Sequence, residues 1–258
     1  MNITWNAKEY KKNFQFVPQY GEDVLNLLHC GPGAFAVDLG CGNGALSAKL
    51  AERGYYVLGV DASREMLEIA AEQYPDIRFM QGDACTVQFA EKMGRKADVI
   101  FSNAVLHWID AEKQEQLIRN LAGQLKTGGE FVCEFGGKGC AETVHSALEK
   151  NFAREGLTYR RSFYFPTIGE YAPILEKYGF RVEYATLFDR PTEQKNKDGL
   201  REWINMFVKI PFEGMDQKIK MKIIDETEEE LRDVLFHDGK WYIDYVRIRF
   251  RAVKMREV

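Results

Sequence analysis

Three glycines at alternate positions constrain this chain more than any other feature. Gly40, Gly42 and Gly44 lie between an apolar run at 35–39 and a segment of helical spacing at 45–53. The apolar run predicts a buried strand, and glycine lets the chain turn sharply and lets a ligand approach bare backbone. Strand, glycine turn and helix in this order predict the opening unit of an open α/β sheet.

A second predicted strand ends at Asp61, and an acidic residue there can accept hydrogen bonds from ribose hydroxyls. The glycines alone leave two ligand types open. Ala45 completes the G-x-G-x-x-G/A pattern of dinucleotide sites. Asp38, just before the glycines, favours a cation instead, because a pyrophosphate binds best at a helix N-terminus without a nearby carboxylate.

The segment 38–44, Asp-x-Gly-x-Gly-x-Gly, resembles the first motif of the class I S-adenosylmethionine-dependent methyltransferases. S-adenosylmethionine carries a sulfonium and an ammonium and no phosphate, which suits Asp38. The resemblance implies methyl transfer to a small molecule, with S-adenosyl-L-homocysteine as the second product. Two alternatives stay open: a nicotinamide-dependent oxidoreductase, although the chain has no Tyr-x-x-x-Lys pair, and a non-catalytic S-adenosylmethionine-binding module.

Within that family the chain is most similar to the trans-aconitate methyltransferases. Residues 102–108, Ser-Asn-Ala-Val-Leu-His-Trp, resemble the segment that lines the methionine end of the cofactor. Asp83 matches the acidic residue that pairs with the adenine amino group. The aromatic stretch 5–18 resembles the segment that closes over the cofactor, and Trp203 a tryptophan of the inserted helices. Residues 102–105 differ from the Asn/Asp-Pro-Pro-Tyr motif of enzymes that methylate nucleic-acid bases.

Motifs and resemblance together give the predicted site. The predicted cofactor-binding residues are Tyr10, Asp38, Gly40, Cys41, Gly42, Gly44, Asp61, Ala62, Met66, Asp83, Ala84 and Asn103. The predicted acceptor-binding residues are His107, Trp108, Tyr164, Arg190 and Trp203. His107 is the candidate catalytic base, and the alternative for it is a pocket wall that orients the acceptor. Arg160 and Arg161 join Arg190 as candidate partners of an anionic acceptor.

Composition excludes several classes of function. The net charge of −4 and pI near 5.7 argue against a nucleic-acid binder. No apolar run approaches the length of a membrane span, and the N-terminus lacks the apolar core of a signal peptide. Five cysteines without C-x-x-C predict neither a disulfide framework nor a metal site. We expect a cytoplasmic enzyme, monomeric or weakly homo-oligomeric, with a small-molecule substrate.

Alternating patterns along the chain predict an α/β fold with a Rossmann-like, doubly wound sheet. Strands are predicted at 35–39, 55–60, 77–81, 97–102, 130–135, 180–188 and 240–254, and helices at 22–30, 45–53, 63–74, 111–126, 140–154, 167–178, 200–210 and 216–236. A polar loop is expected at 192–199.

The resemblance adds that the sheet has seven strands, the last one antiparallel. It makes 1–258 a single methyltransferase domain, 1–20 a segment covering the cofactor and 192–236 a helical cap inserted before the last strand.

The last predicted strand has an internal change of phase. Its apolar residues stand at odd positions up to Tyr245 and at even positions from Val246. Such a change predicts a bulge near 245. Arg247, Arg249 and Arg251 share the other face, which we interpret as solvated or packed against a helix, with ligand binding as the less favoured alternative.

Overall fold

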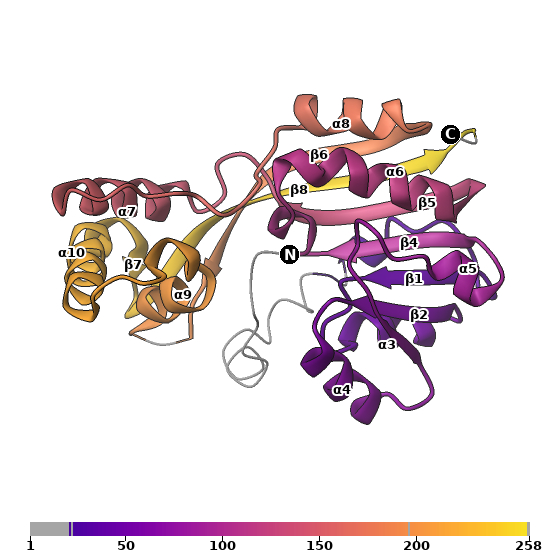
Figure 1. Cartoon of the computed structure of the whole chain (residues 1–258), viewed down its shortest axis with the longest axis horizontal. Coiled ribbons are helices and arrows are strands. Elements are labelled where there is room, and N and C mark those ends of the chain that lie inside the picture. The colour runs from indigo at the N-terminus through magenta and orange to yellow at the C-terminus, as the bar shows by residue number, and fades with distance from the viewer. Residues whose placement is uncertain (1–20, 22, 196, 257–258) are drawn as a thin grey trace.

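The computed structural model describes residues 21, 23–195 and 197–256, so the predicted N-terminal segment 1–20 with Tyr10 lies outside the described residues. A central sheet has the strand order β3-β2-β1-β4-β5-β8-β6 (Figure 1). The bounds are β1 Phe35–Leu39, β2 Tyr56–Asp61, β3 Arg78–Gln81, β4 Ala97–Asn103, β5 Leu125–Gly136, β6 Phe180–Glu193 and β8 Lys240–Lys254. Neighbours from β3 to β5 pair in parallel, and β8 is antiparallel to β5 and β6. The predicted seven-stranded sheet with an antiparallel last strand is confirmed.

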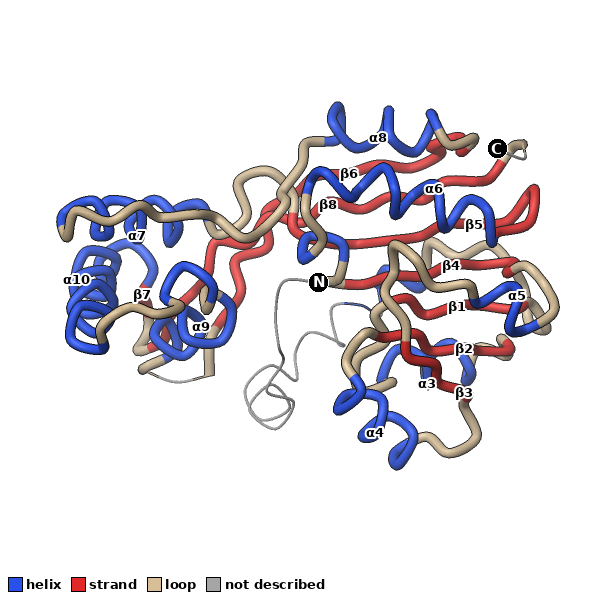
Figure 2. The backbone as a smooth tube through the Cα atoms, in the orientation of Figure 1, coloured by secondary structure: helices blue, strands red, loops and turns tan. Residues whose placement is uncertain are grey.

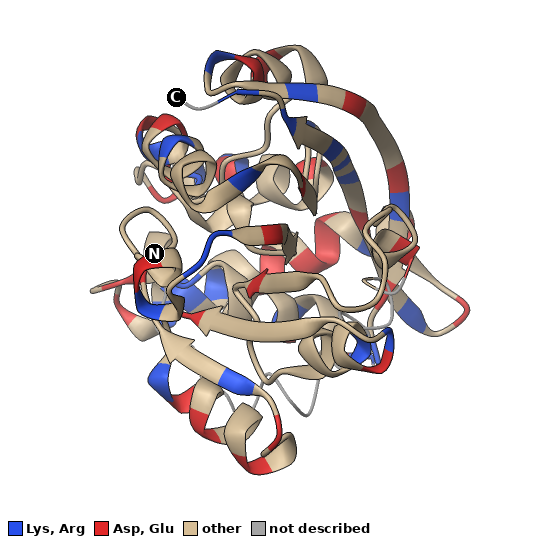
Figure 3. Ribbon diagram, turned by 90° about the vertical axis from the view of Figure 1, so that its right-hand side faces the viewer, with Lys and Arg blue, Asp and Glu red and all other residues tan. Residues whose placement is uncertain are grey.

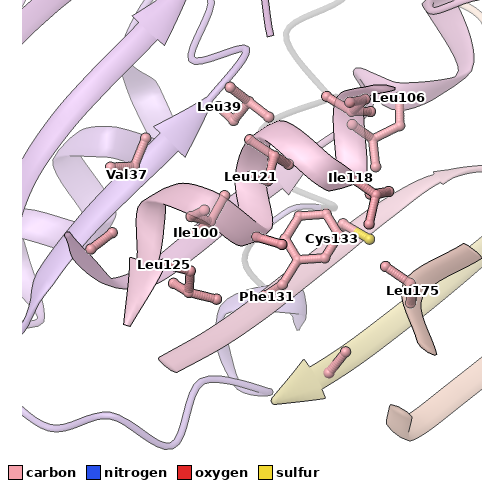
Figure 4. Close-up of a cluster of buried hydrophobic side chains, with 14 of the residues drawn as sticks. Val37, Leu39, Ile100, Leu106, Ile118, Leu121, Leu125, Phe131, Cys133 and Leu175 are labelled. Atoms are coloured by element: carbon pink, nitrogen blue, oxygen red, sulfur yellow. The ribbon is translucent and has the colours of Figure 1, made fainter. Parts of the chain in front are cut away.

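Helices cover both faces of this sheet (Figure 2). The helices associated with the sheet are α3 Ala45–Glu52, α4 Arg64–Gln73, α5 Phe89–Met93, α6 Gln114–Gln124 and α8 Ile168–Lys177. One core cluster lies under α6 and α8 and contains Val37, Ile100 and Phe131 (Figure 4). The cluster on the other face includes the alternate strand residues Ala36 and Val99, together with residues of α3. Burial on both faces explains why the parallel strands are continuous apolar runs.

Element boundaries differ from the predictions where a specific contact intervenes. Ser63 caps α4 as predicted, accepting a hydrogen bond from the Met66 backbone N–H at 3.3 Å. The helix predicted at 22–30 is helical at 21 and 23–25 and then ends. The N–H groups of His29 and Cys30 donate instead to the Glu130 carboxylate, at 2.9 and 3.4 Å. The loop expected at 192–199 begins two residues late, because β6 continues to Glu193.

A second group of helices gathers beyond the end of the sheet where β6 and β8 project (Figure 1). It consists of α7 Glu142–Arg154, α9 Gly199–Phe207, the 3-10 turn Ile210–Phe212, α10 Gln217–Leu235 and the short strand β7 Phe236–His237. These elements share a core with the first residues of β8, through Trp241 and Ile243, and we call it the cap core after the cap predicted at 192–236. The two helices expected between the last two strands of the sheet are therefore present as α9 and α10.

The predicted bulge near residue 245 is wrong. Pairing of β6 with β8 runs unbroken from Tyr184 opposite Arg251 to Glu193 opposite Tyr242, and the irregularity lies on β6 between 182 and 184. The apolar residues of β8 change from odd to even positions because its two ends bury opposite faces of the strand. Tyr245 points into the cap core, whereas Ile248 points into the core under α6 and α8.

Two of the odd-numbered arginines of β8 form ion pairs with buried carboxylates of β5. Arg251 pairs with Glu130 at 2.6 Å, and Glu134 holds both Arg249 and Arg190. This face is therefore a partly buried charge network, and neither a solvated nor a helix-covered surface. Elsewhere both signs of charge are spread over helices and outer strands (Figure 3). No helix in the described part of the chain is both long and apolar enough to cross a bilayer.

Candidate active site

Two cavities open where the parallel strands end. The first, which we call the strand-end cavity, contains about 450 Å³ of empty space; it is lined by Leu39, Gly40, Val60, Asp61, Ala62, Gly82, Asp83, Ala84, Cys85, Val105, Ile109, Asp110 and Lys113. The second, the aromatic cavity, contains about 500 Å³; it is lined by Ala104, His107, Trp108, Cys140, Ala141, Phe163, Phe165, Trp203, Phe207, Tyr245 and Arg247.

Asp61 is fixed in the strand-end cavity by the glycine turn. Its Oδ2 accepts from the Gly42 N–H at 2.9 Å, and its Oδ1 accepts from the Ser63 N–H at 2.8 Å. Each carboxylate oxygen has a further lone pair, so both can still accept from ligand hydroxyls. Burial raises the pKa of Asp61, and the two backbone donors counteract part of that rise.

Gly40 shows why the first position of the turn must be glycine. Its φ is +74°, and an added Cβ would lie 2.2 Å from Cγ2 of Val105, across the strand-end cavity. A side chain here would both strain the backbone and displace the opposite wall. Gly42, with φ of +54°, places its N–H on Asp61 and leaves only Met66 near an added Cβ.

Asp38 lies beneath the turn and does not line either cavity. It is 1% exposed, and its Oδ2 accepts a hydrogen bond from the Ser47 hydroxyl at 2.6 Å. Burial raises the pKa of Asp38 to about 7, with Ser47 lowering it and nearby Asp61 raising it further.

The lining of the strand-end cavity selects for the charge of its ligand. Among the described residues it offers the carboxylates Asp61, Asp83 and Asp110 and one cation, Lys113, which pairs with Asp110 at 3.0 Å. This excess of acid disfavours a pyrophosphate and favours a ligand with positive charge. S-adenosylmethionine fits that lining, with Asp61 placed for a diol and the apolar Ala84 and Val105 for a flat ring.

The sequence identified five of the thirteen residues that line the strand-end cavity. Of the predicted cofactor residues, Gly40, Asp61, Ala62, Asp83 and Ala84 line it, whereas Asp38, Cys41, Gly42, Gly44, Met66 and Asn103 do not. Val105 was expected near the cofactor only as part of the segment 102–108, whose resemblance implied that it lines the methionine end. Sequence reasoning missed Leu39, Val60, Gly82, Cys85, Ile109, Asp110 and Lys113. Their sequence signal is position, since they lie at or after the ends of strands at the same edge of the sheet.

The aromatic cavity contains three of the five predicted acceptor residues: His107, Trp108 and Trp203. Tyr164 is not part of its lining, because neighbouring side chains of an extended segment point to opposite sides. Phe163 and Phe165 face the cavity instead, stacked at 5.2 Å with an interplanar angle of 8°.

The arginines predicted to hold an anion do not line the aromatic cavity. Arg190 binds both oxygens of Glu134, at 2.5 and 3.0 Å. Arg161 makes a similar two-point contact with Glu142 near the protein surface. The cavity contains Arg247 instead, for which sequence reasoning favoured a solvated or helix-packed face and kept ligand binding as the lesser alternative.

His107 is held rigidly at the junction of the sheet and the aromatic cavity. It lies in the 3-10 turn Leu106–Trp108, and its Nδ1 accepts from the Gly136 backbone N–H at 3.1 Å. The buried Gln114 amide donates to the carbonyls of Leu106 and Ile109, at 3.0 and 2.8 Å. Burial lowers the pKa of His107 well below 6.5, and the positive charge of Arg247 lowers it further.

One short segment separates the two cavities. Val105 and Ile109 face the strand-end cavity, while Ala104, His107 and Trp108 face the aromatic cavity. The two cavities therefore lie on opposite sides of residues 104–109. Direct transfer of a small group requires contact between the two bound molecules, so a donor and an acceptor would have to meet at the edge of this segment.

Comparisons with known proteins agree with this geometry. Residues 37–133 match the family model described as a methyltransferase domain. An uncharacterized methyltransferase of Schizosaccharomyces pombe is 33% identical over 97% of this chain and 98% of its own length. The trans-aconitate 2-methyltransferase of Deinococcus radiodurans is 27% identical over 98% of this chain and 99% of its own.

Solved structures share the fold. The structure of a Bacillus halodurans protein assigned to the methyltransferases has a TM-score of 0.64 and 16% identity, covering 91% of this chain and 98% of that one. Two further structures with TM-scores of 0.57 and 0.52 contain S-adenosylhomocysteine. Because the Schizosaccharomyces pombe methyltransferase is 33% identical over nearly the full length of both chains, the chain belongs to the S-adenosylmethionine-dependent methyltransferases that act on small molecules.

Proposed function

We propose that the methyl acceptor is a small molecule with a carboxylate, and that this carboxylate binds Arg247 in the aromatic cavity. One observation carries the proposal: among the described residues, Arg247 is the only charged side chain that lines the cavity, and no acidic residue lines it. A half-buried cation in an aromatic enclosure is stabilised by a bound anion. Arginine also presents a planar fork that matches the geometry of a carboxylate.

The immediate surroundings of Arg247 support this assignment. Its guanidinium carbon lies 4.4 Å from the centroid of the Tyr245 ring, which holds the side chain against the cavity wall. Its Nε is buried and has no hydrogen-bond partner. Arg249 and Arg251, on the same face of β8, are paired with glutamates, whereas none of the described carboxylates pairs with Arg247. The guanidinium therefore has capacity for an incoming anion.

The chain's own residues contribute alignment and exclusion of water. S-adenosylmethionine, when bound, supplies a methyl group on an already activated sulfonium. Asp61 and the glycine turn would hold its ribose, and Asp83 its adenine. The wall of Trp108, Phe163 and Trp203 would orient the acceptor and exclude water, which is the main requirement for an in-line displacement. A carboxylate oxygen is a competent nucleophile without a base.

The relatives support the same class of acceptor. The Deinococcus radiodurans relative is named for trans-aconitate, a carboxylic acid, and it aligns over nearly the whole of both chains. An alignment over 98% of this chain includes the helices α9 and α10 and nearly all of the N-terminal segment. We accordingly propose the helices α9 and α10 as the cap over the acceptor and His107, Trp108 and Trp203 as parts of its pocket.

A panel of small mono-, di- and tricarboxylic acids, incubated with enzyme and S-adenosylmethionine, tests the proposal by product mass. Arg247→Gln should lower kcat/KM for the acid by about 10- to 100-fold, the effect of removing a hydrogen bond to a charged group. Arg249→Gln is the matched control, because it lies on the same face but outside the cavity, paired with Glu134. If no acid is methylated by enzyme that binds S-adenosylhomocysteine, the carboxylate proposal is wrong.

A further inference from the structure

The hydrogen bond at Nδ1 determines which nitrogen of His107 carries the proton. The Gly136 N–H can only donate, so Nδ1 must present its lone pair. A neutral imidazole has one N–H, and it must then be on Nε2. The opposite tautomer would place two N–H donors against each other at 3.1 Å.

The surroundings of His107 keep the ring neutral. The side chain is buried, and the titratable groups that share its cavity are Arg247 from β8, Tyr245 from β8 and Cys140 before α7. Burial raises the pKa of the Cys140 thiol, so it adds no negative charge. The described lining thus contains no anion that would stabilise an imidazolium, and Arg247 opposes one.

Nε2 is the free end of this ring. His107 lines the aromatic cavity, and within the described residues no group bonds to its Nε2. The contrast with the other buried histidine is informative. His145 bonds Tyr159 through Nδ1 at 2.7 Å, its Nε2 is buried without a partner, and it does not line the cavity.

We propose that His107 binds the acceptor as a hydrogen-bond donor through Nε2–H, and that it does not act as a general base. This inference rests on the proposed carboxylate acceptor. Arg247 and the Nε2–H of His107 would then hold the acceptor's carboxylate from two elements of the cavity. A base would need a lone pair on Nε2, which the Gly136 N–H excludes.

The reaction balances without a proton acceptor on the enzyme. A lone pair of the acceptor carboxylate forms the new carbon–oxygen bond to the methyl group. The carbon–sulfur bond breaks, and its electron pair stays on sulfur. The products are a methyl ester and neutral S-adenosylhomocysteine thioether, and no proton is released. A donor at Nε2 therefore suits the reaction, because it orients the nucleophilic group without consuming a proton.

Nitrogen NMR of the full-length enzyme labelled with ¹⁵N-histidine tests the tautomer directly. The chain has four histidines, and His107→Gln identifies the signals of this one. We expect the Nε2–H form, unchanged from about pH 5.5 to 8, around the ordinary histidine pKa of about 6.5. A proton on Nδ1, or titration within this range, would overturn the inference. The measurement needs no acceptor, so it is independent of the proposed function.

Kinetics test the role in binding. His107→Gln retains a donor and should keep most of kcat/KM, whereas His107→Phe should lose about 10- to 100-fold, chiefly through KM. His145→Gln is the control for a buried histidine outside the cavity. The wild-type kcat/KM for an active acid should be flat from about pH 6 to 8. A rise with an apparent pKa near about 6.5 that His107→Phe removes would show a base and overturn the donor role. If no acid turns over, the proposed function fails, and the NMR experiment still decides the tautomer.

Discussion

Replacing Asp38 with asparagine should stabilise the cofactor-free enzyme above neutral pH. Asp38 is almost fully buried, and its folded-state pKa is about 7, against an ordinary value of 3.8. Between these two values the unfolded chain has released the proton and the folded chain still holds it. The unfolded state then binds fewer protons, so the free energy of unfolding falls as pH rises through this window and is constant above it.

The size of the effect follows from the shift in pKa. A difference of about three pH units corresponds to about 4 kcal/mol lost between pH 3.8 and 7. Asparagine has no such titration, and like the protonated carboxyl group it accepts a neutral hydrogen bond from Ser47. At about pH 8 the variant should therefore be more stable than the wild type by about 4 kcal/mol, with a smaller advantage at about pH 5.

Urea unfolding of both proteins at pH values from about 5 to 8 measures this difference. Asp76→Asn, at an exposed position, is the control for removing a surface carboxylate. Parallel stability curves for wild type and Asp38→Asn would refute the reasoning, because Asp38 would then be ionised throughout. We also expect the variant to bind S-adenosylmethionine more weakly, since it loses a carboxylate beneath the site of a cationic ligand, and isothermal titration measures that cost.

Three further predictions concern the cavities. Asp61→Ala should weaken S-adenosylhomocysteine binding by about 1.5–3 kcal/mol; unchanged affinity by isothermal titration would exclude its role at the ribose. Gly40→Ala should lower Tm and abolish cofactor binding because its Cβ would meet Val105, whereas Gly33→Ala, also at positive φ but in open space, should cost only about 1–2 kcal/mol of stability; equal losses in both assays would contradict this. Gln114→Ala leaves two loop carbonyls unpaired and should cost about 2–3 kcal/mol in urea unfolding and also lower kcat/KM; full activity would show that this amide does not hold the turn.

Local patterns predicted the part of the site that a single strand and turn determine. The glycine turn and Asp61 lie within one βαβ unit, so spacing alone brings them together. The aromatic cavity is different, because it combines the turn after β4, the loop before α7, the loop before α8, the helix α9 and β8. Sequence spacing carries no information about which side chains of five such distant segments meet.

Arg247 and Tyr164 illustrate that limit. Arg247 has the same alternation as Arg249 and Arg251, and only the position of the glutamates on β5 distinguishes a paired arginine from an unpaired one. Tyr164 lies between two phenylalanines that face the cavity. Side chains alternate along this extended segment, and the sequence does not say which of the two alternating sets faces the cavity. Explaining the change of apolar positions near 245 likewise required knowing which face of β8 each group of helices covers.

The strand β8 belongs to both cores of the molecule, and β6 pairs with it along most of its length. Trp241 and Ile243 are part of the cap core, and Phe250 is part of the core beneath α8, on one uninterrupted ladder. A rigid-body hinge needs a few residues that are free to change φ and ψ, and this doubly paired ladder offers none between the two cores. The cap should therefore melt together with the sheet in one cooperative transition, and truncating it should yield an unfolded chain instead of a smaller, still folded cofactor-binding unit.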